Sequence, residues 1–373
     1  MRVLYISRGG NPHDHRFLSA LAETEHELFF LPLEATAIEE RRHVPPNIKT
    51  LEGPNPSDGS GNSAKSLDAG SLRQILDQIQ PDVVHAGPIQ SGAFLAAQCD
   101  WHPLVSMSWG SDLLVGAESG EGKERAEYAL MRSDVLLCDC ETVRQAAVDL
   151  GMPDNRIVVF PWGVDLEEFS PGQEDSLRGA LGWQDALILL STRAWEPIYG
   201  VDVIVKAFIQ ASRKEPSLRL VMLSDGSLRA SLLAELEGEG ALDLVHATGS
   251  IEPAELAPFY QTADLYVSAS HSDGSSISLL EAMACGIPAL VSDIPANQEW
   301  VVPEKTGWWF EDGDADQLAD QFVHTAMVRD QLPEIGRRAR EVAEARADWQ
   351  VNFGRLLDAY EMAALTPEYR EQM

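Results

Sequence analysis

The stretch ADLYVSASHSDGSSISLLEAMACG, residues 263–286, decides the expected fold of this chain. Its apolar segment 265–267 predicts a buried strand, a loop rich in serine and glycine follows, and the next helical pattern carries Glu281, eight residues after Asp273. In an open α/β sheet, ligands bind where the carboxyl end of a strand leads into a helix N-terminus. Free backbone N–H groups attract phosphate there, and carboxylates accept hydrogen bonds from hydroxyls. The segment therefore predicts a site for an anionic ligand rich in hydroxyl groups.

Short apolar runs alternate with helical patterns along the rest of the chain. In the first half, strands are predicted at 3–7, 27–31, 82–85, 104–107, 135–138 and 157–159, with helices at about 13–24, 71–79, 90–98, 121–132 and 141–151. In the second half, strands are predicted at 186–191, 218–223, 242–246, 265–267 and 289–291, with helices at 201–212, 227–236, 253–261, 278–285, 314–329, 333–346 and 348–364. This alternation is typical of βαβ units. We therefore predict the α/β class with two Rossmann-like domains.

Turn-forming residues separate the two series. The sequence FPWGVD at residues 160–165 is soon followed by FSPG at 169–172, a composition typical of a linker. We expect an N-terminal domain of residues 1–162, joined by a C-terminal crossover helix at about 350–373, and a C-terminal domain of residues 163–349. Two such domains would face a cleft that suits a donor and an acceptor. Residues 50–66, rich in Gly, Pro, Asn and Ser, are predicted to form a loop.

Composition excludes several classes of protein. The 373 residues contain 28 Lys and Arg against 59 Asp and Glu, a net charge of −31, so nucleic acid and anionic membranes are not expected partners. Four cysteines are too few for a disulfide framework, and Cys138 and Cys140 are interpreted as ordinary buried residues. No apolar run approaches the ~20 residues of a membrane span, and the first strand leaves no place for a signal peptide. We expect a reduced, cytoplasmic protein without a transmembrane segment.

The two carboxylates of the opening stretch each have a purely structural alternative. Ser278 and Glu281 match a capping box, so capping and ligand binding are both open for Glu281. Asp273 alone fits a loop or a helix cap. The spacing of the two carboxylates, with Gly274, Ser275 and Ser276 between them, favours a ligand.

Other predicted strand ends suit either a ligand or a turn. Arg193 follows the strand at 186–191, where a guanidinium could grip a diphosphate, and a surface ion pair with Glu196 is the alternative. Three further strands are followed by small or polar turns, at Gly9-Gly10, Gly110-Ser111-Asp112 and Asp225-Gly226. Gly9 and Gly10 permit close backbone approach but form no G-x-G-x-x-G fingerprint. Simple turn formation explains the other two equally well.

Metal dependence is not expected from the residues. His13 and His15 flank Asp14, but no further ligands follow at zinc spacing. Asp312-Gly313-Asp314 could hold a divalent cation, although a turn and an N-cap at the start of a helix explain it more simply.

A set of ordered motifs points to one family. They are PWGVD…F.P at 161–171, STR…GVD at 191–202, DGSLR at 225–229, the run 263–288 ending in GIP, and QEW…TG at 298–307. In the same order they resemble the PxGVDxxxFxP hinge, the GR…KG phosphate segment, the GxGPxR turn, ADxxVxPSxxEGxxxxxLEAMAxGxP, and E(I/W)V…TG of the family 4 glycosyltransferases, the large retaining group with the GT-B fold. The resemblance spans nearly the whole chain and is densest over residues 158–315.

The resemblance implies a metal-independent, front-face transfer of a sugar from a nucleotide diphosphate sugar, with retention at the anomeric carbon. Arg193 would hold the diphosphate, Glu281 would bind the ribose, and Asp273 would contact the donor sugar; these three are the implied catalytic residues. The implied donor-binding residues are Gly9, Gly10, Arg193, Gly226, Ser250, Ile251, Asp273, Gly274, Ser275, Ser276, Ile277 and Glu281. Candidates for orienting the acceptor are Asp14, Trp109 and Asp112. No cofactor is implied, because the nucleotide sugar is a co-substrate.

Three positions depart from the family pattern. Ile198-Tyr199-Gly200 stands where Lys-Gly is usual, Asp273 replaces a Glu, and Trp109 replaces a His. The acceptor is expected to be a sugar, a lipid-linked compound or another small molecule. Two alternatives stay open: a catalytically weak nucleotide-sugar-binding protein, and a nucleotide-sugar epimerase on the same fold, which would turn over the donor without an acceptor.

Overall fold

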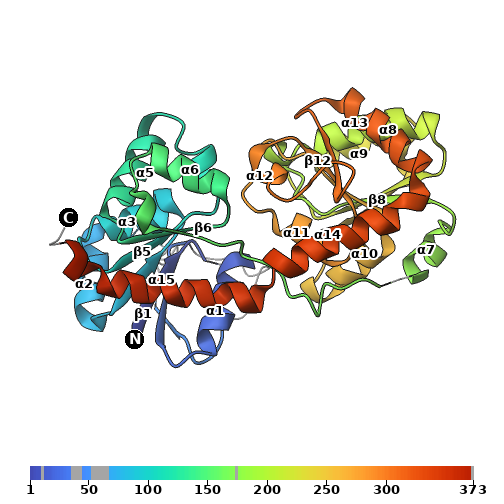
Figure 1. The fold of residues 1–373 in the computed structure, drawn as a ribbon. Coiled ribbons are helices and arrows are strands. Elements are labelled where there is room, and N and C mark those ends of the chain that lie inside the picture. The colour runs from blue at the N-terminus through green and yellow to red at the C-terminus, as the bar shows by residue number, and fades with distance from the viewer. Residues whose placement is uncertain (10–11, 35–43, 52–66, 173–174, 371–373) are drawn as a thin grey trace, which may run out of the picture. The chain divides into compact units, whose positions relative to one another are not determined.

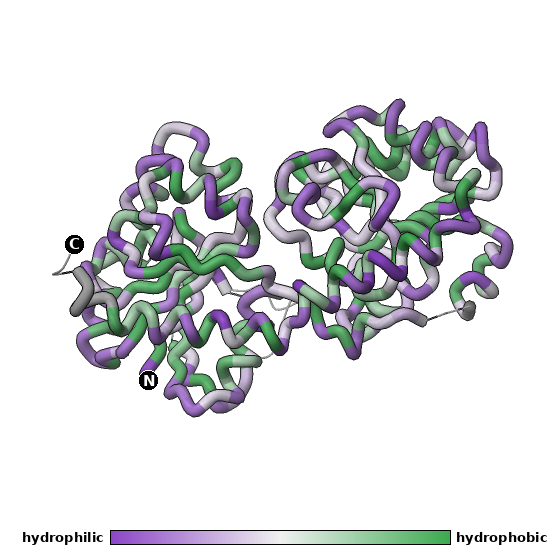
Figure 2. The backbone as a smooth tube through the Cα atoms, viewed as in Figure 1, coloured by the Kyte–Doolittle hydropathy of each residue, from purple (hydrophilic) through white to green (hydrophobic). Residues whose placement is uncertain are grey.

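The computed structural model describes residues 1–9, 12–34, 44–51, 67–172 and 175–370. The chain divides into two compact units: unit 1 consists of Met1–Phe160 and Phe353–Met373, and unit 2 of Pro161–Asn352. Each unit has helices packed on both faces of a central sheet (Figure 1). Hydrophobic residues concentrate in the central strands, whereas the helices alternate hydrophobic and hydrophilic residues (Figure 2). Each unit is therefore built around its own apolar core.

Within the described residues, unit 1 has a seven-stranded parallel sheet of order β3-β2-β1-β4-β5-β6-β7. The strands are β1 (Arg2–Ser7), β2 (Glu27–Pro32), β3 (Lys49–Thr50), β4 (Val83–Ala86), β5 (Leu104–Met107), β6 (Val135–Cys138) and β7 (Ile157–Val159). The helices are α1 (Pro12–Ala22), α2 (Ala69–Ile79), α3 (Phe94–Ala97), α4 (Ser111–Leu114), α5 (Gly120–Arg132), α6 (Glu141–Asp149) and most of α15 (Trp349–Arg370). The α/β class with parallel strands is confirmed.

Most predicted elements of unit 1 are confirmed to within about two residues. The helix expected at 90–98 is present at residues 89–97, where a π-helical turn (Ile89–Ala93) leads directly into the short α3. A Cβ on Gly92 would lie 2.4 Å from the carbonyl oxygen of Gly87, so this turn has no room for a larger residue at position 92. The edge strand β3 pairs with β2 over only two residues, too few for a sequence pattern. Most of the loop predicted at 50–66 lies outside the described residues.

Unit 2 has a six-stranded parallel sheet of order β10-β9-β8-β11-β12-β13 in the described part of the chain. The strands are β8 (Leu187–Ser191), β9 (Leu218–Leu223), β10 (Val245–Gly249), β11 (Leu265–Ser268), β12 (Ala289–Ser292) and β13 (Gly307–Phe310). The helices are α7 (Asp175–Leu181), α8 (Val201–Lys214), α9 (Arg229–Gly238), α10 (Leu256–Thr262), α11 (Ile277–Ala284), α12 (Pro295–Gln298), α13 (Ala315–Met327) and α14 (Leu332–Arg346).

The sheet of unit 2 is buried on both faces. Leu187 and Leu189 of β8 pack into one apolar cluster, and Ile188 and Leu190 pack into the other, as the two-residue period of a strand requires. This explains why its strands read as continuous apolar runs. The strand predicted at 242–246 begins three residues later than expected, because a 3₁₀ turn takes up Leu242–Leu244.

The last helix, α15, packs against unit 1. Tyr360 of α15 is fully buried, and its hydroxyl lies 2.7 Å from Nδ1 of His85 in β4. No helix among the described residues combines the length and the apolar character needed to cross a membrane.

Candidate active site

The strand order of unit 2 creates a topological switch point between β8 and β11. The chain leaves β8 for β9 and β10 on one side of the sheet and returns to β11 on the other. The loops that follow β8 and β11 therefore diverge at the carboxyl edge, which is where open α/β sheets bind ligands. The loop after β8 carries Arg193, and the loop after β11 carries Asp273 and leads into α11.

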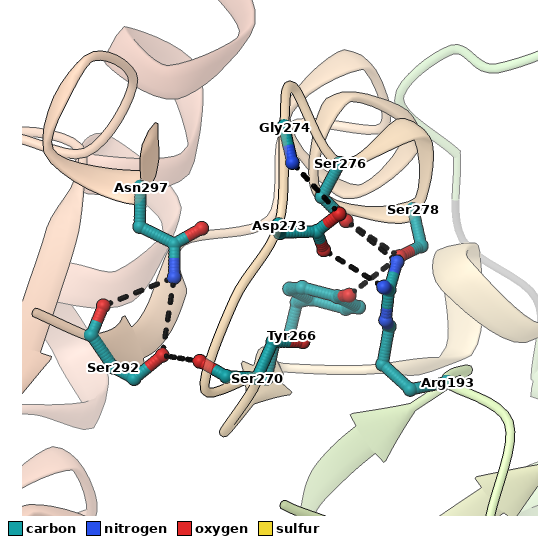
Figure 3. A network of polar contacts seen from close by, with 10 residues as sticks. Arg193, Tyr266, Ser270, Asp273, Gly274, Ser276, Ser278, Ser292 and Asn297 are labelled. Atoms are coloured by element: carbon teal, nitrogen blue, oxygen red, sulfur yellow. Dashed lines mark hydrogen bonds and ion pairs between the residues drawn. The ribbon is translucent and has the colours of Figure 1, made fainter. Parts of the chain in front are cut away.

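Arg193 is held by the first turn of α11 (Figure 3). Its Nη1 donates to Ser276 Oγ at 2.9 Å and to Ser278 Oγ at 3.3 Å, and its Nη2 lies 2.7 Å from Asp273 Oδ2. The Tyr199 ring stacks against the guanidinium, 4.1 Å from ring centroid to Cζ. Burial acts to lower the pKa of Arg193, but Asp273 and neighbouring tyrosines hold this pKa above its ordinary value.

The alternative reading of Arg193 as the partner of Glu196 is wrong. Glu196 instead accepts hydrogen bonds from the backbone N–H and the hydroxyl of Ser227. Arg193 therefore points to the ligand edge of the sheet and its counter-ion is Asp273.

Asp273 occupies the centre of this network. Its Oδ1 accepts a hydrogen bond from its neighbour's backbone, Gly274 N, at 3.1 Å. Burial raises the pKa of Asp273, and the charge of Arg193 together with hydrogen bonds from Gly274 and Ser276 partly offsets that rise. The carboxylate therefore binds both a guanidinium and a backbone N–H, two kinds of group that also bind phosphate.

The rest of the β11–α11 loop is fixed by buried hydroxyls. Ser275 Oγ accepts a hydrogen bond from Trp300 Nε1 at 3.1 Å. Ser292 Oγ at the end of β12 donates to the Ser270 carbonyl at 2.6 Å, and Asn297 Nδ2 donates in turn to the Ser292 carbonyl at 3.0 Å (Figure 3). The loop is thus preorganised by β12 and α12 rather than by its own serines alone.

The capping interpretation of Glu281 is wrong. Helix α11 begins at Ile277 with Ser276 as its N-cap residue, so Ser278 lies inside the helix and cannot be the cap. The Glu281 side chain is buried instead, and its Oε2 accepts a hydrogen bond from the Tyr260 hydroxyl at 2.8 Å. A buried carboxylate at the switch point suits hydroxyl recognition.

The remaining donor candidates of unit 2 line the same carboxyl edge. A Cβ on Gly226 would lie 2.5 Å from the Trp195 carbonyl oxygen, so close packing alone requires glycine there. Ser250 is exposed just after β10, and Ile251 is half buried against the core. No ligand contact of these residues is tested by the structure, and their assignment stays a prediction.

In unit 1 the corresponding switch point lies between β1 and β4. Gly9 has a φ of +92°, and a Cβ there would lie 2.9 Å from Pro32 Cβ. Asp14 is buried and accepts hydrogen bonds from Ser7 Oγ at 2.6 Å and from Gly9 N at 3.2 Å, so it shapes the β1–α1 loop. Gly10 lies outside the described residues.

Asp112 and Trp109 differ in what they offer to a ligand. Asp112 accepts hydrogen bonds from Ser108 Oγ at 2.6 Å and from the backbone N–H groups of Trp109 and Ile89, at 3.0 and 2.7 Å, so its oxygens are used within the fold. Burial raises the pKa of Asp112, and these hydrogen bonds oppose that rise. The indole Nε1 of Trp109 is buried and has no hydrogen-bond partner in the described part of the chain. No acceptor contact of either side chain is tested by the structure, and both assignments stay predictions.

Residues on other elements support the site and were not among its predicted members. Tyr199, Tyr260 and Asn297 contact Arg193, Glu281 and Ser292, respectively. Only Tyr199 could have been found from the sequence, because it stands where the family usually has a lysine. Within the described residues no group of three or more His, Cys, Asp or Glu side chains is placed to hold a metal ion.

Comparison with known proteins identifies the family of this chain. Residues 173–341 match the family model of glycosyl transferases group 1, and residues 8–168 match that of glycosyltransferase family 4. The D-inositol 3-phosphate glycosyltransferase of Streptosporangium roseum is 29% identical over 311 residues, 75% of this chain and 69% of the relative. That of Saccharomonospora viridis is 28% identical over 306 residues, 74% and 70% of the two chains. This chain belongs to the family 4 glycosyltransferases.

Solved structures show the same fold. HepE of Anabaena in complex with UDP superposes with a TM-score of 0.80 at 16% identity, covering 97% of this chain and 100% of HepE. Sucrose-phosphate synthase from Thermosynechococcus elongatus gives a TM-score of 0.76 at 18% identity, covering 97% and 98%. The two parallel-sheet units are thus those of the GT-B fold, and the protein is a transferase.

Proposed function

We propose that this protein transfers a glycosyl group from a nucleoside diphosphate sugar to an acceptor hydroxyl, with retention of configuration and without a metal ion. Arg193 carries the proposal: its guanidinium lies at the switch point of unit 2, against the first turn of α11. The structures of HepE with UDP and with UDP-glucose support the donor class.

In the proposed reaction, the bond between the anomeric carbon and the diphosphate oxygen breaks and its electron pair stays on the diphosphate. Arg193 and the backbone N–H groups at the start of α11 stabilise the charge that develops there. The acceptor oxygen bonds to the anomeric carbon on the face that the diphosphate leaves, and its proton passes to a phosphate oxygen. Glu281 accepts hydrogen bonds from ribose hydroxyls. The indole N–H of Trp109 donates to the acceptor, which is a sugar, a lipid-linked compound or another small molecule.

Calorimetric titration of UDP, GDP and ADP tests the donor site. We expect one of them to bind the wild type, and Glu281→Ala to weaken that binding by about 1–3 kcal/mol, the cost of an unmade buried hydrogen bond. The matched control is Glu237→Ala, an exposed glutamate on α9, which should leave the affinity unchanged. Binding of none of the three nucleotides, or equal affinity in Glu281→Ala, contradicts the proposal.

One observation favours a second candidate, a catalytically weak nucleotide-sugar-binding protein. The charge of Arg193 is neutralised by Asp273, and Tyr199 stands where the family carries a lysine. Such a protein would bind the nucleotide yet release no diphosphate from its sugar with any acceptor. Measuring nucleoside diphosphate release with and without EDTA, across a panel of sugar acceptors, separates the two functions and tests metal independence.

A further inference from the structure

The ion pair between Arg193 and Asp273 sits where the proposed function needs a free positive charge. The two side chains expose 13% and 18% of their surface, and Nη2 and Oδ2 are 2.7 Å apart. Water screens charges less strongly around such largely buried groups than at the surface, so the attraction between the two side chains is substantial. A diphosphate that binds Arg193 must therefore compete with the Asp273 carboxylate.

The carboxylate also occupies a second phosphate-binding group. Gly274 N donates to Asp273 Oδ1 at 3.1 Å, while Arg193 pairs with Oδ2. One carboxylate thus bridges a guanidinium and a backbone N–H of the loop that precedes α11, as a phosphate would. Figure 3 shows the carboxylate between the two donors.

In the described network, no second positive charge beside Arg193 offsets the negative charge of Asp273. The segment after β8 places Tyr199, rather than a lysine, against the guanidinium of Arg193. The other Arg193 contacts, Ser276 and Ser278, are neutral hydroxyls. Arg193 Nε is buried without a hydrogen-bond partner among the described residues.

We propose that Asp273 is a built-in competitor of the donor diphosphate: the diphosphate takes Arg193 and the Gly274 N–H from Asp273, and the released carboxylate accepts a hydrogen bond from a hydroxyl of the donor sugar. This inference rests on the proposed function. It makes the site discriminate between substrate and product. A nucleoside diphosphate leaves the displaced carboxylate beside an anion without a partner, whereas a nucleotide sugar supplies a hydroxyl to it.

Calorimetric titration of UDP and GDP into Asp273→Asn tests the competition. Removing the charge while keeping the shape should tighten binding of the nucleoside diphosphate at least tenfold. The control Asp312→Asn removes a carboxylate from the same sheet edge, where it pairs with His271, and should change the affinity less than twofold. Equal or weaker nucleoside diphosphate binding in Asp273→Asn overturns the inference.

The gain must depend on Arg193. In an Arg193→Gln background, Asp273→Asn should give a clearly smaller gain in nucleoside diphosphate affinity, because only the Gly274 N–H is left to release; a gain as large as in the Arg193 protein overturns the inference. Asp273→Asn should also lower the ratio of nucleotide-sugar affinity to nucleoside diphosphate affinity, and a ratio that does not fall overturns it too. If Asp273→Asn fails to fold, as circular dichroism would reveal, Asp273→Ser replaces it with the same expectations.

The outcomes separate this inference from the proposed function. If the wild type and Asp273→Asn bind neither nucleoside diphosphate nor nucleotide sugar, the proposed function itself fails and the inference falls with it. If the wild type binds and Glu281→Ala weakens binding, but Asp273→Asn does not tighten it, only the inference fails.

Discussion

At the scale of single residues, the site depends on buried polar groups whose partners come from distant parts of the sequence. Glu281 is paired with Tyr260, which is itself fully buried on α10. Burial and the charge of Glu281 raise the pKa of Tyr260 well above its usual value, so this hydroxyl stays protonated and donates. The hydrogen bond between these two buried groups therefore contributes to stability.

Tyr260→Phe should therefore lower the free energy of unfolding by about 0.5–1.5 kcal/mol, the contribution of one hydrogen bond. Urea denaturation followed by circular dichroism measures this change. Tyr128→Phe is the matched control, because no hydrogen bond of its hydroxyl is seen in the described residues, and it should stay within about 0.5 kcal/mol of the wild type. An equal effect of both substitutions would contradict the role of the Tyr260 hydroxyl.

At the scale of elements, glycines set how closely helices and turns pack around α11. A Cβ on Gly336 in α14 would lie 1.9 Å from the carbonyl oxygen of Gly286, just after α11. Backbone atoms cannot move aside as a flexible side chain can. Helix α14 and the turn after α11 are therefore in direct backbone contact, which anchors the helix that carries Glu281.

Gly336→Ala should destabilise the protein by about 1–3 kcal/mol, as overpacking does. Gly238→Ala provides the contrast, since Gly238 is also helical, in α9, and a Cβ there meets nothing within 4 Å. That substitution should stabilise by about 0.4–1 kcal/mol through the unfolded chain. Thermal unfolding of both variants measures the difference. A Gly336→Ala variant as stable as Gly238→Ala would rule out the backbone contact.

At the scale of the whole molecule, the last helix, α15, contacts a buried histidine in the sheet of unit 1. His85 Nδ1 lies 2.7 Å from the Tyr360 hydroxyl, 275 residues away, and its Nε2 has no partner among the described residues. Burial lowers the pKa of His85 from 6.5 to about 3. Between about pH 3 and pH 6.5, the imidazole is therefore neutral in the folded protein but protonated in the unfolded chain.

The sign of the pH dependence follows from this shift. The unfolded chain binds a proton at His85 below pH 6.5 and the folded protein does not until about pH 3. Stability from this group is complete above pH 6.5 and is lost as the pH falls, by about 1.4 kcal/mol per pH unit. Urea denaturation of the wild type and His85→Gln at pH 7, 6 and 5 should show a stability difference that depends on pH in this way. A difference independent of pH would contradict it.

Periodicity and turn chemistry, which are local, were enough to predict the class and most strands, whereas the family resemblance was needed to bring Arg193, Asp273 and Glu281 together as one candidate site. They failed where a neighbour far along the chain decides the outcome. The Glu281 carboxylate accepts a hydrogen bond from Tyr260 of another helix, which the capping-box pattern does not predict. The pairing of Arg193 with Asp273 instead of Glu196 likewise depended on β8 lying beside β11. Strand order and burial arise from the whole folded chain, so only the tertiary structure decided those contacts.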